Sequence, residues 1–448
     1  MRIICIRNGL DIRSIICNFA DTKKSSFTAM IKIMLGALVA SLTLLSACSN
    51  TIPQTPTPEG RQDIVLTRTQ QEFVTKGNGF AMNLVQKLDQ EYTGKSFVCS
   101  PLSIQFALGM VNTGAVGETS GEITEMLGFG DADAAAINEY AKVLTDALTT
   151  VDNTTRMDIA NLLVHNSHGV PAGKTLLKAP FTSALESSYK AGIEAFDFMK
   201  DNTATLRRIN SWCAQKTEGM IPEILKEVKP DALAYFLNAI YFKGIWRQKF
   251  TAQQTSPQAF TREDGTTVQV DMMHQTADFG YGEDKICKRL TMPYGNGAFR
   301  LTAFLPNAGC SVSDVIASLD GNSIREQIGH QYEETVTVAF PKFETSSTLP
   351  LNDVLEALGM KRAFVSGLAD FTAMSDWADC ISLVLQKARI KLDEEGTEAA
   401  AVTVVEMMKA TAVGPSDPLV FIADHPFFYV ISEISTGAIL FAGIYTGD

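Results

Sequence analysis

Residues 393–405 have side chains of a type and spacing that suit a segment able to enter an existing β-sheet as a new strand. The segment reads D-E-E-G-T-E-A-A-A-V-T-V-V. In an extended chain alternate side chains point to opposite faces, so the face that starts at Thr397 is uncharged, and the face that starts at Glu398 has charges only near its ends. Bulky or charged inward side chains would cost desolvation free energy. Gly396 permits a turn that a residue with a β-carbon would find strained.

Six segments, in the same order along the chain, resemble the serpin family. They are residues 97–104 (FVCSPLSI), 210–221 (NSWCAQKTEGMI), 238–246 (NAIYFKGIW), 340–343 (FPKF), 393–405 and 424–427 (DHPF). The resemblance covers roughly residues 67–448. It implies an α+β fold with several helices packed on three β-sheets and an exposed reactive-centre loop. It also implies a monomeric inhibitor of proteases that is not an enzyme and needs no cofactor.

The resemblance implies a kinetic mechanism. A serine protease, or a cysteine protease, cleaves the loop and is held as an acyl-enzyme. The cleaved loop then inserts as a new strand of the central sheet before hydrolysis is complete. The driving force includes ladder hydrogen bonds, each contributing about 0.5–1.5 kcal/mol net, so a barrier must hold back the uncleaved form.

The resemblance also assigns residues of the loop. The hinge comprises Glu394, Glu395, Gly396, Thr397, Glu398, Ala399, Ala400, Ala401 and Val402. The family keeps the distance from the hinge glycine to the cleaved bond nearly constant, which predicts cleavage between Ala410 and Thr411. Alanine there suits an elastase-type pocket. Cleavage after Lys409 or Met408 is the alternative, and would suit trypsin-like and chymotrypsin-like proteases respectively.

Polar residues beneath the sheet complete the predicted site. Ser100, Ser103, Asn238 and Gln386 resemble the shutter, a cluster that exchanges hydrogen bonds as the strands part. Family members often carry histidine at the position of Gln386, and glutamine can likewise donate and accept. Trp246 resembles the tryptophan of the breach, the end of the sheet where insertion begins.

Two other functions compete with inhibition. Some serpins bind or chaperone other molecules without inhibiting proteases, but these tend to carry charged or bulky hinge residues, whereas Thr397 and residues 399–402 are small or modest. An enzyme is the more remote alternative. Ser187 and Lys190 match the S-x-x-K motif of penicillin-binding acyltransferases, but no uninterrupted K-T-G follows. His165 and His168 have no third ligand motif nearby, so no metal site is expected.

Composition limits the class of partner. The chain has 448 residues, of which 46% are hydrophobic and 20% charged, as in ordinary globular proteins. Its net charge of −12 disfavours nucleic acid or an anionic membrane surface as the partner, because both attract clusters of lysine and arginine.

The N-terminal part predicts export. Lys32 precedes an apolar run, residues 33–45, that is too short to span a bilayer. The run ends in Leu-Ser-Ala-Cys, which resembles a bacterial lipobox with Cys48 as the lipidated residue; an ordinary cleaved signal is the alternative. We therefore predict four parts: an upstream segment (1–29), a signal peptide (30–47), a Pro/Thr-rich linker (48–66) and the folded body (67–448). If translation starts at Met30 or Met34, the upstream segment is not translated. The protein would be anchored to the membrane by lipid and face the periplasm or the cell surface.

The elements that position the site follow from periodicity. Apolar residues recur at helical spacing in residues 80–88 and 104–111. Strand-like runs follow at 235–242, 299–305, 335–340, 381–392, 419–422 and 428–434. Helices first and strands later favour an α+β domain. The five cysteines of the body are widely spaced, so they indicate neither a zinc site nor a disulfide framework and are expected to be small buried hydrophobes.

Overall fold

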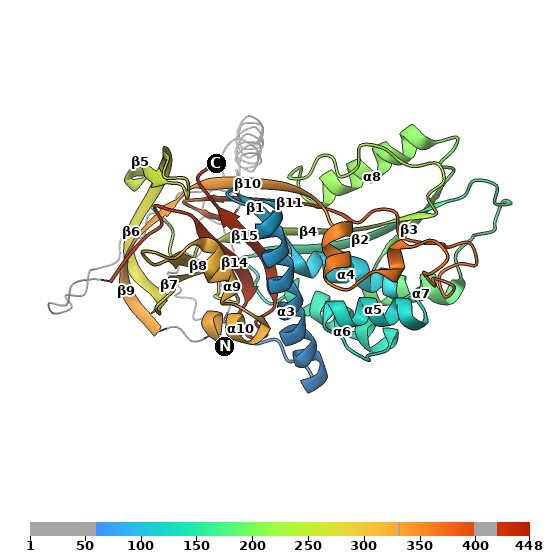
Figure 1. Cartoon of the computed structure of the whole chain (residues 1–448), viewed down its shortest axis with the longest axis horizontal. Coiled ribbons are helices and arrows are strands. Elements are labelled where there is room, and N and C mark those ends of the chain that lie inside the picture. The colour runs from blue at the N-terminus through green and yellow to red at the C-terminus, as the bar shows by residue number, and fades with distance from the viewer. Residues whose placement is uncertain (1–59, 330–331, 398–418) are drawn as a thin grey trace, which may run out of the picture. The chain divides into compact units, whose positions relative to one another are not determined.

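A computed structural model describes residues 60–329, 332–397 and 419–448 (Figure 1). Within these residues helices dominate the first third and strands the rest, as the periodicity predicts. The helices are α3 (Arg68–Glu91), α4 (Pro101–Asn112), α5 (Gly117–Leu127), α6 (Ala134–Leu148), α7 (Ala179–Tyr189), α8 (Asn202–Lys216), α9 (Val312–Ala317), α10 (Gly321–Gly329) and α11 (Asn352–Ala357). Short 3₁₀ turns cover Ala252–Gln254 and Arg362–Phe364.

Helix α3 begins where the sequence supplies a capping box. The Thr67 side chain accepts from the Gln70 N–H, and the Gln70 side chain accepts from the Thr67 N–H. This exchange satisfies two N–H groups that a helix start otherwise leaves without partners. The helix then buries one face, which includes Phe80, Leu84 and Leu88, against the core.

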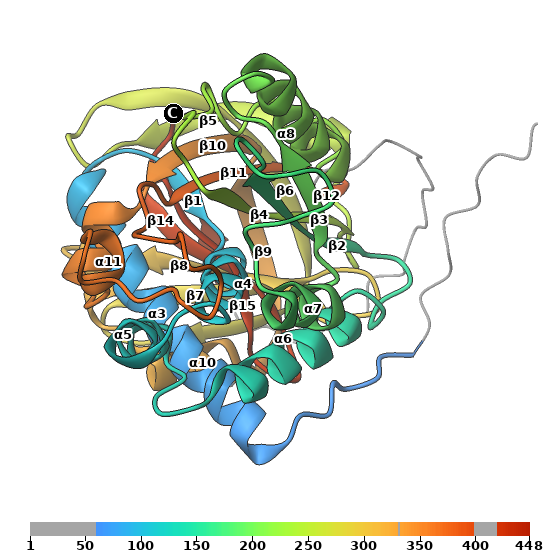
Figure 2. The same ribbon diagram turned by 90° about the vertical axis from the view of Figure 1, so that its right-hand side faces the viewer.

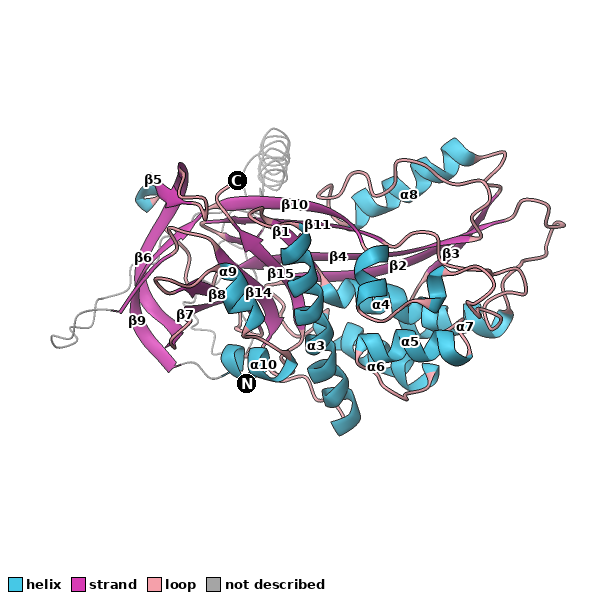
Figure 3. Ribbon diagram, in the orientation of Figure 1, coloured by secondary structure: helices cyan, strands magenta, loops and turns pink. Residues whose placement is uncertain are grey.

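The central sheet carries the predicted hinge. Its order is β10-β11-β12-β4-β2-β3, and Figure 3 shows its long strands side by side. The bounds are β10 (Phe343–Pro350), β11 (Leu385–Asp393), β12 (Gly396–Thr397), β4 (Ala234–Ile245), β2 (Arg156–Asn166) and β3 (Gly192–Phe196). Strand β12 is antiparallel to both of its neighbours.

The remaining described strands form one connected sheet. Its order is β1-β15-β14-β8-β7-β6-β9-β13, with β5 on β6. The bounds are β1 (Phe97–Cys99), β5 (Ser256–Thr261), β6 (Thr267–Glu283), β7 (Cys287–Pro293), β8 (Phe299–Pro306), β9 (Tyr332–Pro341), β13 (Leu419–Ile422), β14 (Phe427–Glu433) and β15 (Ile439–Tyr445). The predicted three sheets are thus two by continuous pairing, because β6 pairs with both β9 and, through Gly280–Glu283, with β7.

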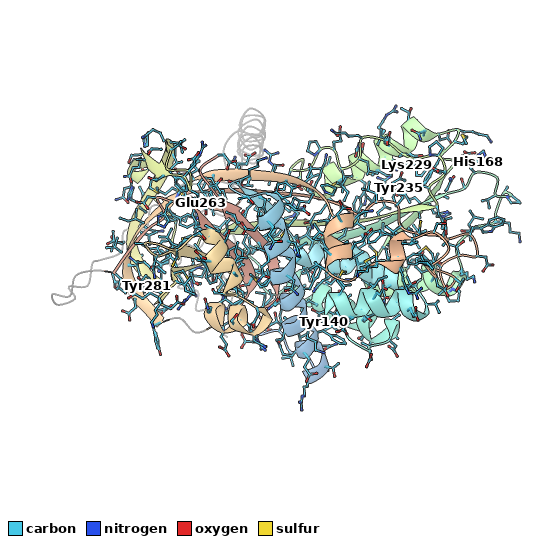
Figure 4. The ribbon with its side chains drawn as sticks, in the orientation of Figure 1. Tyr140, His168, Lys229, Tyr235, Glu263 and Tyr281 are labelled. Carbon is cyan, nitrogen blue, oxygen red and sulfur yellow. The ribbon has the colours of Figure 1, made fainter. Side chains whose placement is uncertain are left out.

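Helices cover the two faces of the central sheet (Figures 1 and 2). Helix α8 lies on one face, where Ile209 and Trp212 join Leu162, Leu237 and Ala239 of the sheet in a small apolar core. At the edge of this core the Tyr235 hydroxyl accepts from the Lys229 N–H at 2.8 Å (Figure 4). Helices α4 to α7 and the larger core lie on the other face. No helix in the described ranges is long and apolar enough to cross a membrane.

Candidate functional site

The first two residues of the predicted inserting face already form a strand. Thr397 pairs with Leu392 of β11 and with Gly244 of β4, and Gly396 pairs with Asp393 and Ile245. Strand β12 therefore occupies one end of the space between β11 and β4. The Thr397 side chain is 3% exposed, so it points inward as the alternation predicts.

Gly396 is required by both its backbone conformation and its surroundings. Its φ of +152° lies outside the range that L side chains favour. A β-carbon here would lie 2.0 Å from the Gly244 carbonyl oxygen and 2.9 Å from Cα of Ile245. Both contacts are with backbone atoms of β4, so no change of side-chain rotamer can relieve them.

We therefore expect Gly396→Ala to displace β12 from the sheet. The backbone strain alone costs about 1–3 kcal/mol, and the contact with β4 adds to it. The measurement is the free energy of unfolding from urea titration. Gly94→Ala is the matched control, because Gly94 also has a positive φ (+70°) but open space around it. Equal losses in the two variants would contradict the proposed close packing.

An aromatic stack holds the turn between β11 and β12. The Trp246 indole N–H donates to the Asp393 carbonyl at 2.9 Å, and the Trp246 backbone N–H donates to the Glu395 carbonyl at 2.8 Å. Its ring stacks on Tyr294, with centroids 4.3 Å apart and planes 13° from parallel. The Tyr294 and Thr397 hydroxyls are hydrogen-bonded at 2.7 Å, and both side chains are buried. Burial raises the pKa of Tyr294, so the phenol stays protonated.

Each of the two hinge glutamates, Glu394 and Glu395, forms an ion pair with a lysine. Lys342 lies 3.0 Å from a Glu394 carboxylate oxygen, and Lys249 lies 2.5 Å from one of Glu395. Thr255 also donates to Glu394 at 2.8 Å. Burial acts to raise the pKa of Glu394, but its hydrogen bonds and the charge of Lys342 outweigh that and lower the pKa. The pKa of neighbouring Asp393 is raised, chiefly by burial.

The lowered pKa of Glu394 predicts an acid-sensitive hinge. A carboxyl group whose pKa is lower in the folded state stabilises the fold at pH values above its pKa in the unfolded state, here 4.5. This stabilisation is lost as the pH falls through the pKa of the folded state. We expect wild type to melt at a higher temperature than Glu394→Gln at pH 7, and the difference to shrink below about pH 4.5. Glu125→Gln, at an exposed position of α5, is the control. A difference that stays constant down to pH 3 would argue against this assignment.

A pocket continues from Thr397 between β4 and β11. It is lined by Thr217, Met220, Ile221, Ile240, Tyr241, Phe242, Arg389, Ile390, Thr397, Ile431 and Phe441. In the described residues no pairing joins β11 directly to β4; β12 is the only strand that links them. The space that a longer β12 would fill is therefore open in part.

The segment after α8 crosses this space and contacts β11. The Lys387 ammonium donates to the Glu223 carbonyl at 2.6 Å, and Arg389 donates to the Met220 carbonyl at 3.2 Å. Asn210 of α8 fixes the same segment by accepting from the N–H groups of Ile224 and Leu225 at 2.9 and 3.0 Å. Sequence reasoning missed these contacts, although the alternating basic residues of β11 were a visible signal.

The predicted shutter is only partly assembled. Gln386 accepts from the Ser100 N–H at 3.0 Å and donates to the Ser100 carbonyl at 2.8 Å. The Ser100 hydroxyl donates to Leu440 and, as the cap of α4, accepts from the Ser103 N–H. Glutamine at this position thus uses its amide both as acceptor and as donor, in both cases toward the Ser100 backbone. Asn238 instead donates to Asn161 across β4 and β2 at 2.7 Å, and its side-chain oxygen is buried with no partner among the described residues.

The residues of the competing motifs have other partners. The Ser187 hydroxyl donates to the Ala184 carbonyl at 3.3 Å, while Lys190 pairs with Asp146. His168 pairs with Asp197 at 2.9 Å (Figure 4), and burial lowers the pKa of His165. Nothing in this geometry brings Ser187 and Lys190 together.

Several predicted site residues lie outside the described residues. They are Cys48, the hinge residues Glu398, Ala399, Ala400, Ala401 and Val402, and Met408, Lys409, Ala410 and Thr411. The roles assigned to them remain predictions.

Comparison with known proteins agrees with this geometry. The family model described as "Serpin (serine protease inhibitor)" matches residues 75–446. An uncharacterized serpin-like protein of Thermococcus kodakarensis is 31% identical over 387 residues, which cover 86% of this chain and 88% of the relative. The thermophilic serpin tengpin in its native state is 26% identical with a TM-score of 0.75, covering 88% of this chain and 98% of tengpin.

Human thyroxine-binding globulin, solved in complex with thyroxine, is similar to the same extent. It is 28% identical with a TM-score of 0.74, and the match covers 84% of this chain and 98% of that protein. The fold is therefore shared by proteins with different roles. From the matched length, the sequence identity and the arrangement of the central sheet, we conclude that this chain is a member of the serpin family.

Proposed function

We propose that this protein inhibits a serine protease, or a cysteine protease, by trapping it after the loop has been cut between Ala410 and Thr411. The observation that carries the proposal is β12. Its two residues already pair with β11 and β4, and the next residues are small. The strand needs only to lengthen.

The observed register predicts where each inserted residue would lie. Continuing it places Glu398 between Lys391 and Lys243, and Thr403 between Gln386 and Asn238. The Thr403 hydroxyl would then face the side-chain oxygen of Asn238, which lacks a partner in the described structure. A buried acceptor without a partner costs about 1–3 kcal/mol, so insertion would relieve a cost that the uninserted form carries.

The register also fits the predicted cleavage site. Strand β4 begins at Ala234, whose partner in the same register would be Met407. A cut after Ala410 therefore leaves a segment long enough to fill the whole length of β4. Cuts after Met408 or Lys409 would do so as well, so the register does not choose among the three bonds.

The test is to incubate the protein with a panel of elastase-like, trypsin-like, chymotrypsin-like and cysteine proteases. We expect one class to give a complex that survives denaturing electrophoresis, and mass spectrometry to place the cut within residues 408–411. Cleavage by every protease without any such complex would reject inhibition. It would favour the binding role known in other members of the fold.

We also propose that Cys48 carries lipid and anchors the protein at the membrane. The support is the lipobox-like ending of a short apolar run. Wild type expressed in a bacterium should incorporate labelled fatty acid and sediment with membranes, whereas Cys48→Ser should do neither. Equal incorporation by both proteins would exclude Cys48 as the attachment site.

A further inference from the structure

Two of the cysteines lie at the same end of one hairpin. Cys287 opens β7, and its partner in the register is Pro306, the last residue of β8. The Asn307 N–H donates to the Ile286 carbonyl at 2.7 Å, and the Cys310 N–H donates to the Asn307 carbonyl at 2.9 Å. The pairing and the turn together fold Cys310 back toward the start of β7. The backbone thus brings the two residues to the same end of the hairpin, and a disulfide between them requires such an approach.

The two thiols differ in access to solvent. Cys287 is 2% exposed, whereas Cys310 is only partly buried. Burial raises the pKa of the Cys287 thiol to about 11; Asp284 and Cys310 push it in the same direction, and Arg289 opposes them. The expectation of small buried cysteines therefore holds for Cys287 and fails for Cys310.

We propose that Cys287 and Cys310 form a redox-sensitive pair that closes to a disulfide when the protein meets a small-molecule disulfide such as oxidised glutathione. The Cys310 thiolate attacks the reagent and releases one glutathione thiol. The Cys287 sulfur then attacks Cys310 in the mixed disulfide and releases the second. The two protein thiols lose two electrons, the reagent gains them, and the two thiol protons end on glutathione.

A bridge here would stiffen the region that holds the end of the reactive loop. The Pro306 carbonyl, opposite Cys287, is 3.0 Å from Nε2 of His425, which follows β13. Helix α9 begins two residues after Cys310 and packs on β8 and β14. The disulfide would join the start of β7 to the start of α9, across the ends of the hairpin.

The test uses the full chain, incubated with oxidised glutathione or with dithiothreitol, quenched in acid, denatured and alkylated. After digestion of the oxidised sample we expect a linked pair of peptides containing Cys287 and Cys310, lighter by two hydrogen atoms than the separate peptides. The oxidised protein should melt a few degrees higher than the reduced one. Cys310→Ser should lose both effects.

Cys380→Ser is the matched control, because Cys380 is also partly exposed. It should keep the link and the shift in melting temperature. Full alkylation of both Cys287 and Cys310 after oxidation would overturn the proposal, as would a link from Cys310 to any other cysteine. Since Cys310 is near the surface, its serine variant should fold, and the readout does not depend on inhibitory activity.

Discussion

Thr397→Arg is expected to turn the protein from an inhibitor into a substrate. Thr397 is the first inward residue of the inserting face, and its hydroxyl is bonded to Tyr294 in a buried position. Thr397 already lies in β12 between β11 and β4, and an arginine in that buried position would leave its charge unpaired. We therefore expect the variant to lose β12, so that insertion has to begin without the paired residues from which the strand lengthens. Insertion would slow while hydrolysis of the acyl-enzyme continued at its own rate.

The effect should be large because inhibition is a competition between rates. Each 1.4 kcal/mol added to the insertion barrier slows insertion about tenfold, and a buried charge left without a partner costs about 3–5 kcal/mol. We expect the fraction of protease held in the stable complex to fall by roughly tenfold or more, with cleaved inhibitor in its place. The measurement is a gel of the reaction with the sensitive protease.

Thr397→Ser is the matched control, because serine keeps the hydroxyl that faces Tyr294 and the small size. It should trap the protease nearly as well as wild type. An undiminished complex with the arginine variant would mean that the loop inserts without Thr397 paired in the sheet, which contradicts the proposal that the strand lengthens from β12.

Patterns within short stretches of the sequence predicted much of the site. Alternation alone placed Thr397 on the inward face, and the apolar spacing in residues 80–88 and 104–111 predicted α3 and α4. The strand predicted at 381–392 begins too early, because β11 starts at Leu385 and the residues before it bond to a 3₁₀ turn and to α11. The Ile381 N–H donates to the Ala363 carbonyl, and the Val384 N–H donates to the Asn352 side chain. A run of strand-forming residues does not reveal such long-range contacts.

The partners of the hinge could not be predicted in this way. Tyr294 lies 103 positions from Thr397 in sequence, and Lys342 lies 52 from Glu394. Lys342 belongs to the F-P-K-F segment, but nothing in that pattern indicates that its ammonium group meets Glu394, and Tyr294 lies in none of the six segments. These residues reach the breach only when the sheets pair. The same holds for Asn161, whose bond to Asn238 depends on the pairing of β2 with β4. Only tertiary structure supplies these contacts.

Cleavage of the loop is expected to make the protein markedly more resistant to heat. In the observed register, residues 398–407 would add ten residues to β12. At about 0.5–1.5 kcal/mol net for each hydrogen bond, the added strand contributes on the order of 5–15 kcal/mol. We expect the melting temperature to rise by roughly 10 °C or more after the cut.

The uncut chain cannot gain this strand easily, because both ends of the loop are fixed. Residue 407 would lie beside Ala234, ten residues along β4 from Gly244, or about 33 Å away. The chain would then have to return to β13, which is paired with β9 from Leu419 onward. Residues 408–418 span at most about 40 Å when fully extended, so the return would use nearly all of that length and strain the anchor.

Calorimetry before and after limited cleavage measures the gain, and Thr397→Arg cut at the same bond is the comparison. It should gain much less, because an arginine at position 397 opposes the pairing of β12 from which the added strand lengthens. If wild type melts at the same temperature after cleavage, the loop has no strand to form in the sheet. The inhibitory mechanism would then lack its driving force, and the pairing of β12 would be a fixed feature of a binding protein.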